Sequence, residues 1–399
     1  MAQKRLLILG GAEFQIPLIK EAKSKNLLVG VIDMKVDAPA KKYSDVFYQA
    51  SLKDWDKVLH FAKKFSPNGI TAGMVDIAVP VCAYVSSILN LPGISMETAK
   101  KATDKFEMIK AFEQNNVPHP YYQYVSKSFI KNTDIQLPYP LIVKPVDMAG
   151  SRGINLVHNE NELFNALQDS SRASDSGNVI IEEYLEGPEV SVELVVRNAI
   201  PYVIQVTDKA TSGAPHFAET GHLQPSQLPC DVIKKIKDVA CAAATSLGLV
   251  NSLGHAEIKV TGEGPKMVEI GARAGGDGIG EQLIELSTGV NFSDLAIKIA
   301  LGENFEISEN RIDQSSCIQF ILSENGVLQS IQGVEKAKAL NNIYDVKITA
   351  ENGRRYASMV DNSGRIGYVI SQANNAKLAK EACEKALKLI TVSYAKEDD

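Results

Sequence analysis

The chain has 399 residues, of which 45% are hydrophobic and 23% are charged, and its formal net charge is −6. This length allows two or three domains with a buried core, and the acidic balance argues against nucleic acid as a partner, although a local basic site could still bind a small anion. The five cysteines form no CxxC pair and no stretch approaches a membrane span, so we expect a cytoplasmic protein without a structural zinc site, a disulfide framework or a membrane partner.

The first part of the chain alternates strand-like and helix-like patterns, which favours a Rossmann-like α/β domain over residues 1–95. Gly10 and Gly11 follow the first apolar run, where such folds often bind ligands. The sequence there is GGAEFQ and not GxGxxG, so an NAD-type dinucleotide site is poorly supported. The expected strands cover 5–11, 27–34 and 69–75, and the expected helices cover 14–26, 54–65 and 79–90.

The middle and the end of the chain change in pattern. A helix-rich stretch at 96–116 precedes a strand, loop and strand at 139–157, and 168–178 reads as an exposed loop before a strand at 179–187. Two alternating runs at 189–196 and 200–207 predict an antiparallel pair, and 278–303 is predicted helical. From 309 to 399, strands at 315–323 and 365–372 and an amphipathic helix at 374–390 predict a small α+β domain.

Residues 255–270 predict a β-hairpin, because apolar β-branched runs flank the turn residues Gly262-Glu263-Gly264-Pro265. If the register centres on Glu263, then Glu257 faces Glu269 and Lys259 faces Met267. Two carboxylates directly opposite each other repel, so this arrangement needs a cation. A slipped register or an exposed hairpin would separate them without consequence.

Two lysines and an acidic pair are further candidates. Lys144 ends an apolar strand and precedes the loop Asp147–Gly153, and an ammonium beside flexible N–H donors suits phosphate. Taken alone, Lys144 could cap a surface strand and Lys105 could lie on a solvated helix face. Glu182 and Glu183 end another apolar strand, where backbone groups could pair with an adenine edge; an exposed acidic loop is the alternative.

The order of these features resembles the ATP-grasp superfamily, and within it the carboxylate–amine ligases that include the L-amino-acid ligases. The resemblance covers roughly residues 95 to 305, and the segment 208–229 is similar to the active-site segment of that branch. It implies an ATP-grasp domain over 96–308, with a mobile lid at about 121–186, between the N-terminal domain and the C-terminal α+β domain.

The resemblance also implies the site residues. Glu257 and Glu269 match the magnesium-binding carboxylates, Arg273 and Lys144 the catalytic cations. Gly271 stands where many members have an asparagine ligand, which leaves the number of metal ions open. The implied ATP-binding residues are Lys105, Lys144, Ser151, Arg152, Gly153, Glu182, Glu183, Leu185, Glu189, Lys209 and His222. The implied substrate-binding residues are Arg273, Gly275, Gly276, His216 and Glu219, although a histidine in this segment could equally be a structural hydrogen-bond partner.

The implied reaction is amide or peptide bond formation from a small carboxylic acid and an amine, expected to be amino acids, with ATP and Mg²⁺ as cofactors and Mn²⁺ as a substitute. An acyl phosphate would be the intermediate, and ADP and phosphate would be released. The alternatives are a purine-biosynthetic, bicarbonate-activating or formate-activating ligase of the same superfamily, and a nucleotide-binding protein without catalysis. Family members commonly form homodimers, so a homodimer is a further expectation.

Overall fold

The computed structural model describes residues 3–132, 134–214, 216–307 and 311–395. Its internal contacts divide the chain into two compact units. The first unit contains Met1–His119, Ser191–Val206 and Cys230–Arg311, and the second contains Pro120–Val190, Thr207–Pro229 and Ile312–Asp399. Within the described ranges, no helix has both the length and the apolar character needed to cross a membrane.

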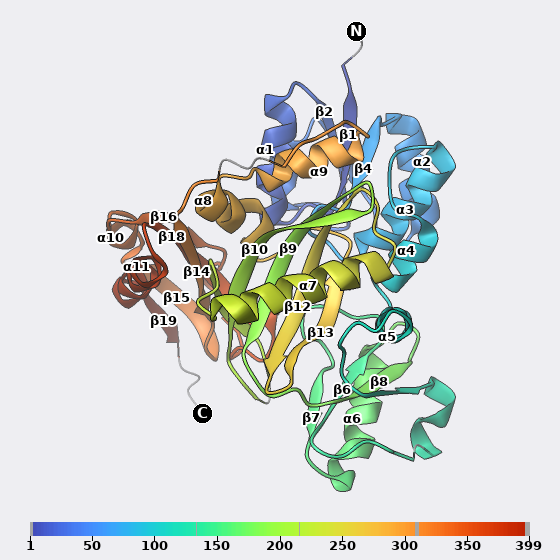
Figure 1. Cartoon of the computed structure of the whole chain (residues 1–399). Coiled ribbons are helices and arrows are strands. Elements are labelled where there is room, and N and C mark those ends of the chain that lie inside the picture. The colour runs from blue at the N-terminus through green and yellow to red at the C-terminus, as the bar shows by residue number, and fades with distance from the viewer. Residues whose placement is uncertain (1–2, 133, 215, 308–310, 396–399) are drawn as a thin grey trace. The chain divides into compact units, whose positions relative to one another are not determined.

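The first unit begins with the predicted Rossmann-like arrangement. Four strands form a parallel sheet in the order β3-β2-β1-β4; they are β1 Arg5–Leu9, β2 Leu28–Asp33, β3 Val46–Gln49 and β4 Gly69–Thr71. The connecting helices are η1 Glu13–Gln15, α1 Ile16–Ser24, η2 Pro39–Tyr43, α2 Trp55–Phe65 and α3 Ala78–Leu89. Helix α2 packs against α3 (Figure 1). Strands β1 and β2 carry almost continuous apolar runs, as expected for strands that are buried on both faces of a parallel sheet.

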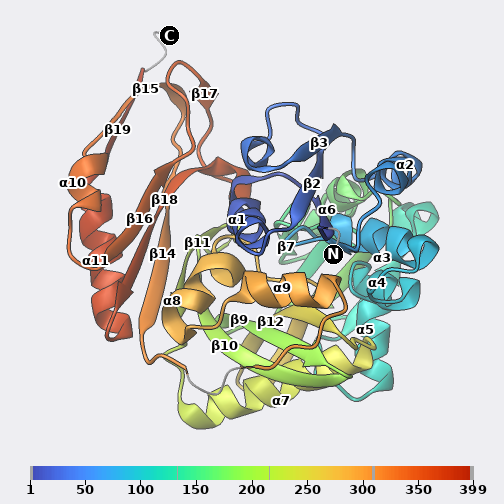
Figure 2. The ribbon, with the colours of Figure 1, turned by 90° about the horizontal axis from the view of Figure 1, so that it is seen from above.

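The rest of the first unit carries the predicted hairpin. Strands β13, β12, β9 and β10 are neighbours in that order, and α7 packs across β12 and β13 (Figure 1). Helix α9 packs against α1 (Figure 2). The elements are α4 Met96–Lys101, α5 Lys105–Gln114, β9 Glu189–Arg197, β10 Ile200–Thr211, α7 Cys230–Ser246, β12 Ser252–Thr261, β13 Gly264–Gly271, the π-helical turn η4 Ile279–Leu283, α8 Ile284–Thr288 and α9 Phe292–Ala300. Strand β10 begins in the first unit and ends in the second.

The second unit contains a four-stranded sheet in the order β5-β8-β6-β7. Its elements are β5 Tyr122–Val125, η3 Lys127–Asn132, β6 Leu141–Pro145, β7 Asn155–Val157, α6 Glu160–Ala173 and β8 Val179–Glu183. The expectation of a loop at 168–178 is wrong in its first half, since α6 continues to Ala173. The helix forms because Leu163, Ala166 and Leu167 make a buried stripe at helical spacing.

The second unit also holds the predicted C-terminal strands and helix. The end of β10 is followed by β11, β14, β18 and β16, and α11 packs on β14 and β18 (Figure 2). Strands β17, β15 and β19 form a separate sheet. The bounds are β11 Glu219–Gln224, β14 Ser315–Leu322, β15 Gly326–Gln332, α10 Val334–Lys338, β16 Ile343–Ile348, β17 Arg355–Tyr356, η5 Asn362–Gly364, β18 Arg365–Ala373, α11 Ala376–Leu389 and β19 Thr391–Ala395.

Two glycines of this region allow a matched test of packing. Gly333 has a φ of +84° and a β-carbon added to it would lie 1.8 Å from the carbonyl oxygen of Leu389, whereas Gly353 has a φ of +80° and no atom within 4 Å. We expect Gly353→Ala to cost only the left-handed strain, about 1–2 kcal/mol. Gly333→Ala must also displace the backbone at the end of α11, so its melting temperature should fall clearly further. Equal melting temperatures of the two variants would contradict this packing.

Candidate active site

The hairpin of β12 and β13 places Glu257 directly opposite Glu269, as the sequence predicts. The expected partner of Lys259 is wrong: Lys259 faces Lys266, and Met267 faces Ile258. The reason is a register shift between Glu257 and Ile258, which a count from the turn cannot reveal. Both carboxylates stay partly accessible, with 19% and 22% of their side chains exposed.

Lys105 supplies a positive charge to one of these carboxylates. Its Nζ lies 2.8 Å from Oε2 of Glu269, and only 10% of its side chain is exposed. Lys105 is the first residue of α5, and the side chain of Asp104 caps that helix by accepting hydrogen bonds from the N–H groups of Phe106 and Glu107. The alternative of a solvated lysine on a helix face is therefore wrong.

His255 supplies a positive charge to the other carboxylate. Its Nε2 lies 3.5 Å from Oε1 of Glu257, and its Nδ1 makes a very short contact with Oε1 of Glu193. Burial lowers the pKa of His255, but the charge and hydrogen bond of Glu193, together with Glu257, raise it to about 10. The ring is therefore an imidazolium at neutral pH, and both of its nitrogens face carboxylates.

Arg273 forms a bidentate ion pair with Asp76, a residue that the sequence does not single out. Its Nε and Nη2 donate to the two carboxylate oxygens of Asp76 at 2.5 and 2.6 Å, and its Nη1 donates to the carbonyl of Ala274 at 2.7 Å. Burial opposes the charge, but Asp76 raises the pKa of Arg273 above its ordinary value. This bidentate pair fixes the plane of the guanidinium. Asp76 follows the short strand β4, at the carboxyl edge where parallel sheets commonly bind ligands.

The two glycines after Arg273 differ. The N–H of Gly275 donates to Oε2 of Glu193 at 2.9 Å, and a β-carbon on Gly275 would lie 2.4 Å from Oε1 of the same carboxylate. A β-carbon on Gly276 would meet nothing within 4 Å. A side chain at position 275 would therefore clash with Glu193, and the N–H of Gly275 already donates to that carboxylate. Gly276, in contrast, has room around its α-carbon.

In the second unit, Lys144 and Glu182 form a buried ion pair. Nζ of Lys144 lies 2.7 Å from Oε2 of Glu182, and their side chains are 4% and 8% exposed. They reach each other because β6 and β8 are antiparallel neighbours, with Ile142 opposite Glu182. Glu182 therefore contacts the lysine. Glu183 accepts the N–H of Tyr121 at 3.2 Å, and Leu185 is buried just after the strand.

The loop before β7 contains three residues in the left-handed region of the backbone map. Gly150, Ser151 and Gly153 have φ values of +72°, +60° and +73°. Arg152 is exposed, and its Nε donates to the carbonyl of Ala149 at 3.0 Å. Gly153 is pinned against α6, since a β-carbon there would lie 2.6 Å from that of Ala173.

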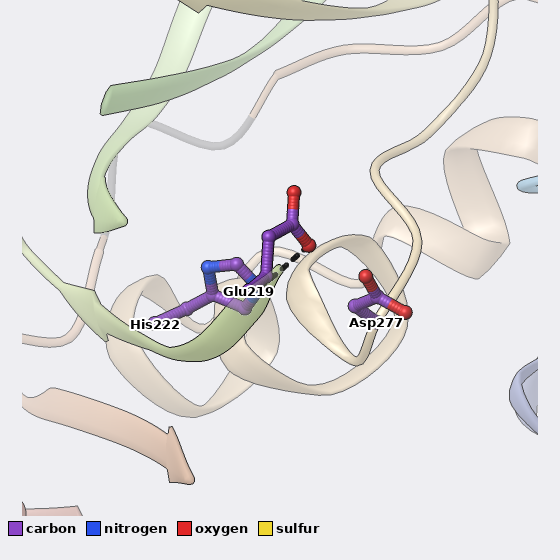
Figure 3. Close-up of side chains that lie close together, drawn as sticks. All are labelled: Glu219, His222 and Asp277. Atoms are coloured by element: carbon purple, nitrogen blue, oxygen red, sulfur yellow. Dashed lines mark ion pairs between the residues drawn. The ribbon is translucent and has the colours of Figure 1, made fainter. Parts of the chain in front are cut away.

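A second charge cluster centres on Glu219. Nζ of Lys209 lies 2.7 Å from both Glu189 and Glu219, and Nη2 of Arg365 lies 3.1 Å from Glu219. His222, three residues along β11, has its Nε2 3.6 Å from the same carboxylate. Figure 3 shows Glu219 and His222 on β11 with this ion pair dashed; it also labels Asp277, which belongs to the first unit. His216 is exposed at the preceding turn.

The cluster extends to three residues of the C-terminal region that the sequence does not single out, which lie in β14, η5 and β18. Asn362 accepts the N–H of Glu219 at 3.0 Å, and the guanidinium of Arg365 stacks on the ring of Phe320, 3.9 Å from its centroid. His222 meets the edge of the same ring. Arg365 begins a strand after a Gly-containing turn, which gives no signal in the sequence that distinguishes it from a surface arginine.

Two protein families match parts of the chain. Residues 137–281 match the ATP-grasp domain, and residues 319–395 match the L-amino acid ligase C-terminal domain 2. The first match contains every implied site residue from Lys144 to Gly276. The second contains Phe320, Asn362 and Arg365.

Three relatives illustrate the range of similar proteins. "Uncharacterized protein y4rH" of Sinorhizobium fredii is 26% identical over 81% of this chain and 68% of its own. A formate-dependent phosphoribosylglycinamide formyltransferase of Sulfurisphaera tokodaii is 23% identical over 98% of this chain and 97% of its own. The crystal structure of L-amino acid ligase from Bacillus licheniformis superposes with a TM-score of 0.87 at 22% identity, covering 99% of this chain and 100% of that one, which is a likeness of fold.

The two family matches follow each other along the chain in the order that the sequence resemblance implies. They agree with a fold in which an α/β domain precedes the ATP-grasp strands and α+β elements follow them. The chain therefore carries an ATP-grasp domain followed by an L-amino acid ligase C-terminal domain, and it is an enzyme of the ATP-grasp carboxylate–amine ligase class.

Proposed function

We propose that this enzyme joins the carboxylate of one amino acid to the amino group of another, using ATP with Mg²⁺ and releasing ADP and phosphate. The observation that carries the proposal is the single strand β13, which presents Glu269 opposite Glu257 and leads within four residues to Arg273. This arrangement brings oxygen ligands for a divalent cation next to a guanidinium that can hold an anion. The match of residues 319–395 to an L-amino acid ligase domain supports amino acids as the substrates.

The donor set of the hairpin fits a magnesium ion. Glu257 and Glu269 offer hard oxygen atoms, face each other on one sheet face and keep part of their surface accessible. Gly271 offers no side-chain ligand, so the remaining positions around an ion would fall to phosphate or water oxygens. When bound, the ion would neutralise charge on the β- and γ-phosphates.

In the proposed reaction the protein's own residues position ATP and the acid and stabilise the negative charge of the phosphates and of the acid. An oxygen of the acid attacks the γ-phosphorus while the bond from that phosphorus to the β-phosphate oxygen breaks, giving an acyl phosphate and ADP. The amine nitrogen then attacks the acyl carbon, phosphate leaves with the former carboxylate oxygen, and the amine loses a proton. Lys105, Lys144 and Ser151 to Gly153 are assigned to the ATP phosphates and Arg273 to the reacting anion. The assigned adenine and ribose contacts are Glu183, Leu185 and Glu189.

The segment around Glu219 is assigned to the substrates. Glu219 already accepts from Lys209 and Arg365, so its carboxylate is oriented, and a substrate ammonium could share its remaining lone pairs. Gly276 and His216 stay candidates for the same role. Gly275 is reassigned to the internal contact with Glu193. A homodimer stays a prediction.

A second candidate is activation of formate or bicarbonate in place of an amino acid. The relative from Sulfurisphaera tokodaii, named a formate-dependent formyltransferase, aligns with 98% of this chain. A small one-carbon acid would need the same phosphoryl chemistry with a smaller acid pocket.

The reaction class can be tested with a matrix of acids and amines. Purified enzyme with ATP and Mg²⁺ should release ADP and phosphate only when a suitable pair is present, and the product mass should equal acid plus amine minus water. Turnover with formate or bicarbonate and no amino acid would select the second candidate. Release of AMP and pyrophosphate would contradict both, because it requires adenylation of the acid.

The hairpin carboxylates can be tested by isosteric neutralisation. Glu257→Gln and Glu269→Gln should each lower kcat by about 100-fold or more, since several kcal/mol of charge stabilisation depends on the ion. Each substitution removes one ion pair but also relieves the repulsion between the facing carboxylates, so we expect the metal-free melting temperature to stay within about 2 °C of the parent. Glu263→Gln at the exposed tip of the same hairpin is the control and should change neither quantity. Normal turnover in both site variants would show that the carboxylates are structural.

The role of Arg273 can be tested by a change that keeps its charge. Lysine cannot reproduce a bidentate grip, so Arg273→Lys should fold and bind ATP but lose about 100-fold or more in kcat with the acid. Asp76→Asn leaves the arginine less firmly oriented and should cause a smaller loss. Arg172→Lys alters an exposed arginine–aspartate pair and should have no effect. Parent activity in Arg273→Lys would exclude a part for the guanidinium in holding the reacting anion.

A further inference from the structure

Glu193 is a fully buried carboxylate to which the reaction described above gives no task. It lies on β9 with 0% of its surface exposed. Taking a charge out of water is costly unless the charge is paired and hydrogen-bonded. Both oxygens of Glu193 meet this requirement: Oε1 contacts Nδ1 of His255, and Oε2 accepts the N–H of Gly275 at 2.9 Å.

The backbone of Gly275 packs closely against Glu193 and His255. A β-carbon on Gly275 would lie 2.4 Å from Oε1 of Glu193 and 2.7 Å from Nδ1 of His255. The carboxylate, the imidazole and the glycine backbone are thus packed in direct contact. Glu193 is therefore an anchor with a fixed position, and His255 is held in one ring orientation by it.

His255 connects the buried Glu193 to Glu257 of the hairpin. It precedes Glu257 by two residues on β12, so the two side chains lie on the same face of the sheet. Its Nε2 points to Oε1 of Glu257 at 3.5 Å, while its Nδ1 is occupied by Glu193. The register shift between Glu257 and Ile258 interrupts the regular pairing of β12 with β13 beside Glu257. Contacts of its side chain therefore contribute more to the orientation of this carboxylate.

We propose that Glu193 and His255 are positioning residues that orient Glu257 for the divalent cation, with Glu193 holding one ring nitrogen and the other ring nitrogen holding Glu257. The inference rests on the proposed function, in which Glu257 is a metal ligand. Carboxylates that bind a metal ion are commonly held by hydrogen-bond partners behind them, and the loss of such a partner typically weakens metal binding about 10- to 100-fold.

Two substitutions of His255 separate the two contacts. The side-chain amide of asparagine reaches the place of Nδ1, so His255→Asn keeps a donor for Glu193 and loses the contact with Glu257. The longer glutamine reaches the place of Nε2, so His255→Gln keeps a donor for Glu257 and leaves Glu193 without its partner. Mn²⁺ binding to the full chain in the presence of ADP, followed by electron paramagnetic resonance, and the melting temperature are measured for both.

The proposal predicts opposite patterns in the two variants. His255→Asn keeps a donor for Glu193, so it should melt at a higher temperature than His255→Gln, yet it should bind Mn²⁺ with ADP about tenfold more weakly than the parent or worse. His255→Gln leaves the buried Glu193 without a side-chain donor and should melt at the lower temperature, yet it should bind Mn²⁺ with ADP more tightly than His255→Asn, because it keeps a donor for Glu257. A merely structural histidine would make the Mn²⁺ affinity follow the melting temperature in both variants, and that result would overturn the proposal.

Glu193→Gln provides a second route to the same answer. It keeps the shape and an acceptor for the N–H of Gly275 but removes the charge that holds His255, so Mn²⁺ binding with ADP should again weaken about tenfold. Parent-like affinity in His255→Asn or in Glu193→Gln would overturn the proposal, as would failure of both variants to fold. If the parent enzyme itself binds no Mn²⁺ with ADP, the proposed function fails instead.

Discussion

Two carboxylates held face to face on β12 and β13 are the constraint on which the surrounding structure depends. Glu257 and Glu269 repel each other, and the chain offsets this with Lys105 on one side and His255 on the other. A different feature of the fold positions each cation: Lys105 is the first residue of a capped helix, and His255 is held by the buried Glu193. The hairpin therefore carries a charge-balanced site before any ligand arrives.

Cation–carboxylate pairs recur throughout both units. In the first unit Arg273 pairs with Asp76, and in the second unit Lys144 pairs with Glu182 and Lys209 with Glu189. Such pairs orient the cations, and a phosphate or carboxylate ligand can then share a cation with its resident acid. Each unit thus carries preorganised charges, which suits a reaction whose catalysis is mainly positioning and electrostatic stabilisation.

Local patterns predict much of this molecule. The alternating elements of residues 1–95 predict the parallel sheet, and the turn residues near Gly262 predict a hairpin with Glu257 opposite Glu269. The partner of Lys259 is mispredicted because the bulge beside Glu257 follows no residue pattern. The start of the expected loop at 168–178 is mispredicted because polar residues such as Ser170 lie on the buried face of α6 and hide its helical pattern. The sequence does not reveal the contacts of Asp76, Glu193 and Arg365, because their partners lie 197, 62 and 146 residues away along the chain. His255 could have been found from its spacing to Glu257 on one strand face.

The most direct measurement follows the carboxylate oxygen. With an acid labelled with ¹⁸O in its carboxylate, the account predicts that each turnover transfers one ¹⁸O atom to inorganic phosphate, as mass spectrometry of the phosphate would detect, because the acyl carbon–oxygen bond breaks when the amine attacks. Unlabelled phosphate during amide formation, with the label in AMP or still in the acid, would contradict the acyl-phosphate mechanism.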